Sequence, residues 1–113
     1  MNASPLIDTA ILDELIGHIG AEAARAVIEL FISECGELAG TIGAPETGHD
    51  EVRRAAHSLK SSAGQLGASA LAEVALDVET AAEGGAPELR SLIKHLQECA
   101  ARTQAALSVR LAG

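Results

Sequence analysis

Hydrophobic side chains recur every three or four residues from about residue 8 to the end of the chain, which is the period of amphipathic helices. Glycine and proline, which favour turns, interrupt this period at residues 17–20, 43–48, 67 and 84–87. We therefore predict five helices. The first runs from Asp8 to Leu15 or Ile16, and the others cover residues 21–42, 47–66, 69 to about 83, and 87 to about 111.

Residues typical of helix ends stand at several of these boundaries. Gly67 suits the left-handed conformation that often ends a helix, because it has no Cβ to clash with the backbone. Short polar side chains can accept hydrogen bonds from the free N–H groups of a first helical turn. The predicted N-terminal signals are Asp8, Thr47 with Asp50 in capping-box spacing, Ser69, and Pro87 in the first turn of the last helix.

Each of the four long helices carries one apolar stripe, which has to be covered for the helix to be stable. Short connections make consecutive helices antiparallel neighbours. The predicted fold is all-α, an antiparallel four-helix bundle with a short additional N-terminal helix across one end, forming a single domain over residues 1–113. In the helix over residues 21–42, the predicted buried positions are Ala24, Val27, Phe31, Cys35, Leu38 and Ile42.

The charge and composition argue against several classes of function. The chain has a formal charge of -8 and a single aromatic side chain, Phe31, which is unfavourable for nucleic-acid binding. It has neither a long apolar run nor a signal peptide, so we expect a cytoplasmic protein that does not enter a membrane. The initial Met and the lack of a long linker favour a stand-alone domain. Cys35 and Cys99 are predicted to be buried free thiols.

One segment departs from the acidic average. The 21 residues 52–72 contain no carboxylate but include three basic residues, Arg53, Arg54 and Lys60. At about 100° per residue, His57 falls on the side of the helix opposite the apolar stripe and among these three cations. The sequence therefore predicts an exposed histidine at the centre of a basic face.

Such an imidazole is suited to accepting a phosphoryl group. Neutral imidazole is a nucleophile near pH 7, and phosphoryl transfer needs mainly positioning and charge neutralisation, which Lys60 would supply from one turn away. The small residues Ser61 and Gly64 leave the approach open. An ordinary surface histidine on a solvated basic face explains the same geometry, so the residues alone leave both interpretations open. No histidine has a second ligand at metal-binding spacing, and no glycine-rich loop suggests an ATP site.

A twelve-residue segment gives the interpretation more weight. His57-Ser-Leu-Lys-Ser-Ser-Ala-Gly-Gln-Leu-Gly-Ala68 resembles the signature of histidine-containing phosphotransfer (HPt) domains. The predicted five-helix plan also fits this family, so the resemblance extends over nearly the whole chain. Further matching positions are Leu30-Phe31-Ile32, Ala56 and Val78-Glu79.

The resemblance implies roles for individual residues. His57 would be the phosphorylated histidine, Lys60 the cation that faces the phosphate, and Gln65 the amide that orients the imidazole or contacts the phosphoryl group. Ser61 stands where the family usually has glycine, and its hydroxyl is small enough that we expect activity to survive. Supporting or docking roles would fall to Ser61, Gly64, Gly67, Arg53, Arg54 and Phe31.

The resemblance also implies a function. The chain would relay a phosphoryl group between aspartates of response-regulator receiver domains through a phosphohistidine, as a monomer and without ATP-dependent kinase activity. Its partners would be receiver domains, a hybrid histidine kinase, or both. It would hold no cofactor of its own, because the receiver supplies Mg²⁺ during transfer. Two alternatives stay open: a helical adaptor that docks a receiver or kinase domain without phosphotransfer, and direct phosphorylation by a kinase's ATP-binding domain.

Overall fold

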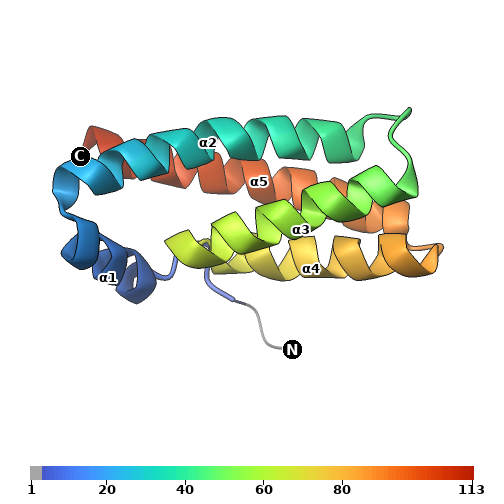
Figure 1. Ribbon diagram of the computed structural model, residues 1–113, viewed down its shortest axis with the longest axis horizontal. Helices are drawn as coiled ribbons and strands as arrows, with labels where there is room; N and C mark the ends of the chain where they lie inside the picture. The colour runs from blue at the N-terminus through green and yellow to red at the C-terminus, as the bar shows by residue number, and fades with distance from the viewer. Residues whose placement is uncertain (1–3) are drawn as a thin grey trace.

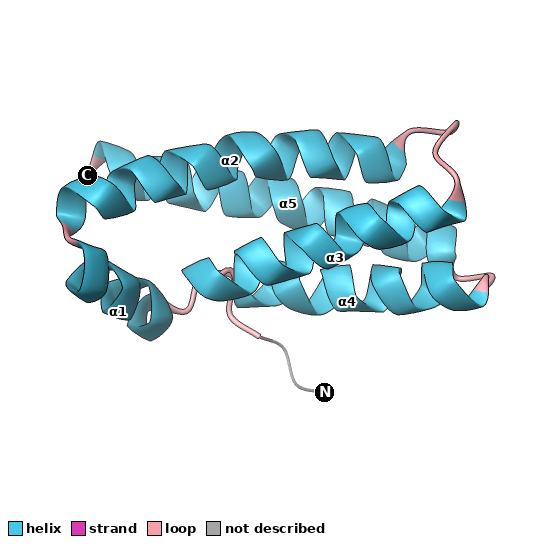
Figure 2. Ribbon diagram, viewed as in Figure 1, coloured by secondary structure: helices cyan, strands magenta, loops and turns pink. Residues whose placement is uncertain are grey.

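The computed structural model describes residues 4–113 and consists of five α-helices joined by short loops (Figures 1 and 2). The four longer helices lie lengthwise, each antiparallel to the next, and the first helix crosses one end of the bundle (Figure 1). This arrangement confirms the predicted all-α fold. The helices are α1 (Thr9–Ile19), α2 (Ala21–Gly43), α3 (His49–Leu66), α4 (Ser69–Gly84) and α5 (Leu89–Ala112).

The core is built from aliphatic side chains because only one aromatic residue is present. Each helix contributes at least one side chain with little or no exposed surface, and the sole ring, Phe31, is 3% exposed. Burying a leucine of this kind stabilises the fold by about 2 kcal/mol relative to leaving it exposed. The largest fully buried side chains include Leu12, Leu59, Leu71, Leu96 and Leu107.

The predicted N-cap of α1 is confirmed, whereas the predicted start of α3 is wrong. Asp8 caps α1 as predicted, because its carboxylate accepts hydrogen bonds from the N–H groups of Ala10 and Ile11. Thr47 does not cap α3: Gly48 is the N-cap, and the Thr47 hydroxyl instead donates to the carbonyl of Thr41 at 2.7 Å. The short Thr side chain has its partner in the preceding helix, so the predicted capping box with Asp50 is wrong.

The starts of α4 and α5 also differ from prediction. Ala68 is the N-cap of α4, and the Ser69 hydroxyl donates to the Gly67 carbonyl rather than accepting from the helix. Pro87 precedes α5, whose N-cap is Glu88, so it stands just outside the first turn. The end of α1 lies later than predicted, at Ile19.

The apolar stripe of α2 is as predicted at Ala24, Phe31, Cys35 and Ile42, but at two other positions it is rotated by one residue. Val27 is 37% exposed, whereas its neighbour Ile28 is 3% exposed and joins the core. Leu38 is only half-buried, and Ala39 takes the inward position one residue later. Adjacent apolar residues in a helix point about 100° apart, so sequence periodicity alone does not decide which of the two faces inward. The rotation leaves Val27 and Leu38 at the surface of α2 that borders α3.

A tight corner at Gly67 fixes how α3 and α4 meet. Gly67 has the left-handed conformation predicted for it, with φ of 85°, and the N–H of Ala68 donates back to the carbonyl of Ala63 at 2.8 Å. The chain before α1 packs on this corner, where the N–H of Asp8 donates to the Gly67 carbonyl at 2.7 Å. A Cβ at Gly67 would lie 2.7 Å from the Asp8 carbonyl oxygen, so only glycine fits without a shift.

Both cysteines are free thiols in the core, as predicted. Cys35 in α2 has no exposed surface, and Cys99 in α5 is 7% exposed. Burial raises the pKa of the Cys35 thiol to about 11, and the neighbouring Cys99 adds to this effect. Because the thiolate is the reactive form, Cys35 should be inert in the folded protein.

We expect Gly67→Ala to lower the free energy of unfolding by at least about 1 to 2 kcal/mol, since alanine is strained at positive φ and its Cβ meets the Asp8 carbonyl. Gly64→Ala is the matched control. Gly64 lies on the exposed face of α3 with open space around its Cα, so alanine should raise stability by up to about 1 kcal/mol. Urea unfolding of the two variants measures both effects, and equal changes in midpoint would contradict the assigned role of the corner.

We also expect Cys35 to react with a thiol reagent only after unfolding. Mass spectrometry after iodoacetamide treatment at pH 8, with and without denaturant, measures the modification at each cysteine. Labelling of Cys35 in the folded protein at the rate of the denatured chain would show that this part of the core is open.

Candidate functional site

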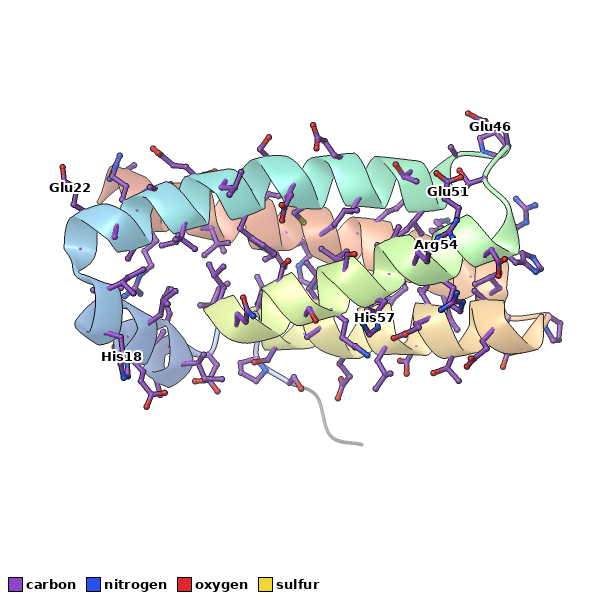
Figure 3. The ribbon with its side chains drawn as sticks, in the orientation of Figure 1. His18, Glu22, Glu46, Glu51, Arg54 and His57 are labelled. Carbon is purple, nitrogen blue, oxygen red and sulfur yellow. The ribbon has the colours of Figure 1, made fainter. Side chains whose placement is uncertain are left out.

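His57 lies near the middle of α3, and its side chain points away from the core. Figure 3 shows it on α3, with Arg54 and then Glu51 following toward the start of the helix. The side chain is 58% exposed, whereas the nearby residues Ala56 and Leu59 are fully buried. The helix period therefore gave the correct orientation for His57, and the imidazole is accessible to another protein.

A carboxylate from the neighbouring helix holds this imidazole. Glu79 of α4 places one carboxylate oxygen 2.8 Å from Nδ1 of His57 and the other 2.9 Å from Nζ of Lys60. The Glu79 side chain is 17% exposed and Lys60 is 30% exposed, so this three-residue cluster is partly shielded from water. We call His57, Lys60 and Glu79 the α3–α4 cluster.

The cluster keeps Glu79 ionised. The hydrogen bond from Lys60 is the strongest influence holding the pKa of the Glu79 carboxyl below its usual range. Burial acts in the opposite direction, but the hydrogen bond from His57 and the positive charge of Lys60 add to the lowering. An ionised carboxylate can only accept hydrogen bonds.

The ionised carboxylate also decides which imidazole nitrogen carries the proton. Nδ1 of His57 has to be the donor to Glu79, so in the neutral ring the lone pair lies on Nε2. Nε2 is the nitrogen left for reaction, on a side chain that is more than half exposed. The arrangement is chemically that of a nucleophile oriented by a hydrogen-bonded base.

Glu79 was predicted only as a position that matches the family pattern, without a role in the site, and the predicted positive charge around His57 was too high. The acid-free segment 52–72 is real along the chain, but α4 brings a carboxylate into the same place from 22 residues away. A signal was available: Glu79 follows the buried Val78 at the edge of the apolar stripe of α4, where a polar side chain is half-covered by the next helix.

Gln65 does not orient the imidazole in this structure. It lies eight residues after His57, about 12 Å farther along the helix. Its side chain borders a small hollow between α2 and α3 together with Val27 and Leu30. Glu79 makes the hydrogen bond to the imidazole instead, and a contact between Gln65 and the phosphoryl group stays a prediction.

Small side chains surround His57 on the side of α2, as the sequence predicts. Ser58, Ser61 and Ser62 border a hollow of about 460 Å³ that His57 also lines. Within residues 4–113, Ser61 makes no hydrogen bond to the imidazole. Its small side chain instead leaves space beside His57. Gly64 is exposed and has open space over its Cα, which extends the accessible strip along α3.

The residues predicted for docking divide into two groups. Arg53 and Arg54 are half-buried and exposed, respectively, one turn before His57, so both border the accessible strip. Phe31, by contrast, belongs to the core at 3% exposure and presents little surface to a partner. The large apolar side chains that α2 does expose are its neighbour Leu30, at 63%, and Val27, at 37%.

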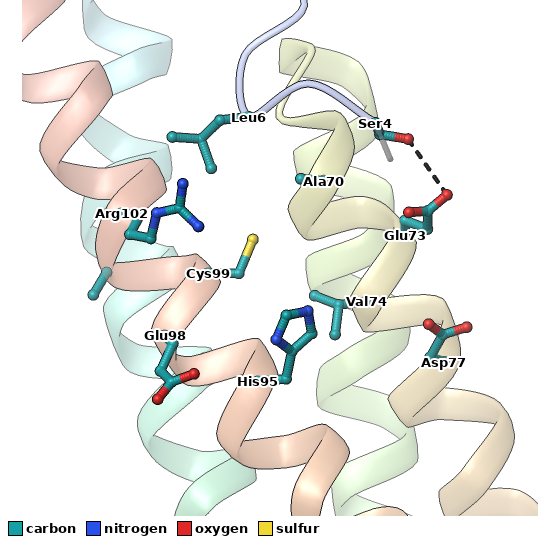
Figure 4. Close-up of a pocket in the computed structure, with 11 residues that line it drawn as sticks. Ser4, Leu6, Ala70, Glu73, Val74, Asp77, His95, Glu98, Cys99 and Arg102 are labelled. Carbon is teal, nitrogen blue, oxygen red and sulfur yellow. Dashed lines mark hydrogen bonds between the residues drawn. The ribbon is translucent and has the colours of Figure 1, made fainter. Parts of the chain in front are cut away.

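Another cavity, with a volume of about 780 Å³, lies elsewhere, between α4 and α5 (Figure 4). It has no lining residue from α3, so it does not include the α3–α4 cluster. The Ser4 hydroxyl at its edge donates to Glu73 at 3.4 Å. The titratable side chains around it are Glu73, Asp77, His95, Glu98, Cys99 and Arg102.

Among residues 4–113, no group of three or more His, Cys, Asp or Glu side chains is arranged to hold a metal ion. In the same range, no helix combines the length and the apolar character needed to cross a membrane.

Comparisons with known proteins concern the fold and the family of the chain. Among curated proteins, no sequence gives a significant match. A solved structure that is similar over 97% of both chains is the histidine-containing phosphotransfer protein B of Pseudomonas aeruginosa, with a TM-score of 0.85 and 19% sequence identity. At that identity the likeness establishes the fold. The family model for the Hpt domain matches residues 26–106, which include the whole of α3 and α4. The chain therefore belongs to the family of Hpt-domain, histidine phosphotransfer proteins.

Proposed function

We propose that Nε2 of His57 accepts a phosphoryl group from an aspartyl phosphate of one receiver domain and passes it to an aspartate of another. The observation that carries the proposal is the hydrogen bond between Nδ1 of His57 and Glu79, which leaves Nε2 as the free and accessible nitrogen. The family relationship supports phosphotransfer in general, and the geometry supports this atom in particular.

The transfer to His57 needs no separate proton acceptor. The lone pair of Nε2 attacks phosphorus, the bond from phosphorus to the aspartyl oxygen breaks, and the leaving group departs as a carboxylate. The proton stays on Nδ1, so the phosphorylated ring becomes a cation. Glu79, 2.8 Å from that nitrogen, supplies the compensating negative charge. The reverse sequence transfers the group onward.

Lys60 supplies positive charge from the same cluster. Its ammonium group has three N–H donors, and Glu79 takes one of them at 2.9 Å. The remaining donors are available to phosphoryl oxygens as negative charge gathers there. Lys60 therefore serves both as the cation predicted for the phosphate and as the partner that keeps Glu79 ionised.

The remaining parts of the reaction belong to the partner. In this proposal the receiver brings Mg²⁺ and its acidic pocket, and Arg53 and Arg54 attract that pocket to the face of α3. A receiver domain, a hybrid histidine kinase, or both would occupy this surface. The cytoplasmic location and the monomeric state stay predictions.

The docking-adaptor alternative is less well supported. An adaptor needs a complementary surface but has no need for a particular imidazole nitrogen. Here the histidine is present, exposed, and held by a carboxylate that is itself held by a lysine. That arrangement favours chemistry at His57 over binding alone.

We expect His57→Gln to abolish acceptance of radiolabelled phosphate from a phosphorylated receiver. His95→Gln is the matched control, because His95 is also an exposed histidine but lies on α5, away from the α3–α4 cluster. Gel autoradiography of the three proteins with each candidate receiver measures the transfer. Equal labelling of His57→Gln and wild type would remove His57 from the reaction. A wild-type protein that binds receivers but is never labelled by them would favour the adaptor.

We expect Glu79→Gln to slow phosphoryl acceptance by roughly tenfold, equivalent to about 1.4 kcal/mol, because the amide can still accept a hydrogen bond but carries no charge. Glu83→Gln is the control, since Glu83 is exposed one turn later on the same helix and lies outside the α3–α4 cluster. Rapid-quench kinetics with one receiver measure the rates. Identical rates for the two variants would contradict the role of the Glu79 charge.

The same Glu79→Gln variant has a pH signature in stability. Because the pKa of Glu79 is lowered by folding, its carboxylate stabilises the protein above the ordinary carboxyl range, about pH 4.3, and this contribution disappears as the pH falls through the folded-state pKa. The stability advantage of wild type over the variant should therefore be present at pH 7, at about 1 kcal/mol, and shrink below about pH 4. A stability difference between wild type and the variant that did not depend on pH would show that Glu79 stabilises the protein through packing and not through its charge.

A further inference from the structure

A continuous groove runs between α2 and α3 from His57 toward the end of the bundle where α1 lies. It consists of two hollows of about 460 and 150 Å³. Glu34 and Ser62 line both hollows, so they connect into one depression, which we call the α2–α3 groove. His57 lines the first hollow only. Any protein that reaches His57 is therefore also next to this groove.

The part of the groove farther from His57 is apolar. Leu30 is 63% exposed and Val27 is 37% exposed on its α2 side. The ring of Phe31 and the side chain of Leu66 also line it, although both are nearly buried. A partner that covers an exposed leucine beside an apolar surface removes apolar area from water, which favours binding.

The part nearer His57 is acidic along α2. Glu34 and Glu37 are exposed there, and no cation within residues 4–113 lies within 4.0 Å of either carboxylate. Glu29 on the same helix differs, because it forms an ion pair with Arg25 at 3.7 Å. Across the groove, α3 presents the hydroxyls of Ser58, Ser61 and Ser62 and no charge.

We propose that the α2–α3 groove selects receivers by charge. It accepts a receiver surface on which an apolar side chain packs on Leu30 and neighbouring Lys or Arg side chains form ion pairs with Glu34 and Glu37. This inference rests on the proposed function and adds the feature that distinguishes one receiver from another. Charge pairs of both polarities then form across the contact, since Arg53 and Arg54 face the acidic pocket while Glu34 and Glu37 face the basic flank.

Charge complementarity favours a receiver over a second copy of this chain. The chain has a formal charge of -8, so two copies repel each other at long range. A partner with a basic flank is instead attracted, and charges at the edge of an interface act mainly on the association rate and its salt dependence. Like charges opposite Glu34 and Glu37 would exclude the wrong receivers.

The test uses the double variant Glu34→Lys/Glu37→Lys, with Glu83→Lys/Glu98→Lys as the control. Both control residues are exposed, neither lines the groove, and the change in net charge is the same. A third variant, Leu30→Ala, tests the apolar part. Each protein is first phosphorylated with phosphoramidate, a small donor that needs no docking, and then mixed with a panel of receivers at low and at physiological salt.

We expect phosphoramidate to label all four proteins equally. For the receivers that wild type prefers, kcat/KM at low salt should fall by about tenfold or more in the double variant and lose much of its salt dependence, whereas the control should change little. Leu30→Ala should lower kcat/KM at both salt concentrations. Receivers with an acidic flank should become better partners of the double variant.

Three outcomes would overturn the inference, and they are distinguishable. If wild type is labelled by phosphoramidate but transfers to no receiver, the proposed function itself fails. If wild type transfers and the double variant keeps the same rates and preferences as the control, the function stands and the groove is not a determinant. If sedimentation shows a wild-type dimer that only the double variant disrupts, the groove binds a second copy instead.

Discussion

The shared carboxylate of Glu79 is the interaction on which the site depends. It accepts one hydrogen bond from Nδ1 of His57 and one from Nζ of Lys60, at 2.8 and 2.9 Å. Each partner has a different consequence: the lysine keeps the carboxylate ionised, and the carboxylate keeps the proton of the neutral imidazole on Nδ1. An exposed surface histidine thereby acquires a defined tautomer, a defined orientation, and a compensating charge for the cation that the proposed phosphorylation would form.

That interaction requires the register between α3 and α4 to be fixed. The two helices meet at the Gly67 corner, where the left-handed glycine lets the chain reverse within a few residues and the chain preceding α1 covers the turn. Fully buried alanines, Ala56 and Ala63 on α3 and Ala75 on α4, allow the backbones to approach closely. Under these conditions position 79 stands opposite position 57. The core thus determines the site by fixing the relative positions of α3 and α4, although no core side chain belongs to the α3–α4 cluster.

Much of this was predictable from the sequence because it depends on local physics. Helix period, the glycine at the corner, the cap at Asp8 and the outward direction of His57 all follow from steric rules and hydrogen bonding within a few residues. The predictions of caps and buried positions were wrong where two local arrangements of a side chain are nearly equal in free energy. Thr47 and Ser69 each had a choice of backbone partner, and the neighbours Val27 and Ile28 could each have faced the core. Packing between helices made those choices.

The site was predicted less completely for a related reason. His57 and Lys60 lie one turn apart, and their relation is visible along one helix. Glu79 is related to them only through the packing of α4 on α3, so neither charge counting nor helical periodicity placed it there. Phe31 was predicted both as a buried position of its helix and as a docking residue; its 3% exposure agrees with the first prediction, because a large ring is better stabilised inside a small aliphatic core. Its exposed neighbour Leu30 occupies the surface position instead.

The most direct test of the central claim is the proton position on the imidazole of His57, measured by ¹⁵N-correlated NMR of the unphosphorylated protein at pH 8. The shared carboxylate predicts a ring with the proton on Nδ1 and an unprotonated Nε2, and predicts that Glu79→Ala loses this preference. A wild-type spectrum with the proton on Nε2, or a tautomer unchanged by removal of Glu79, would contradict the account.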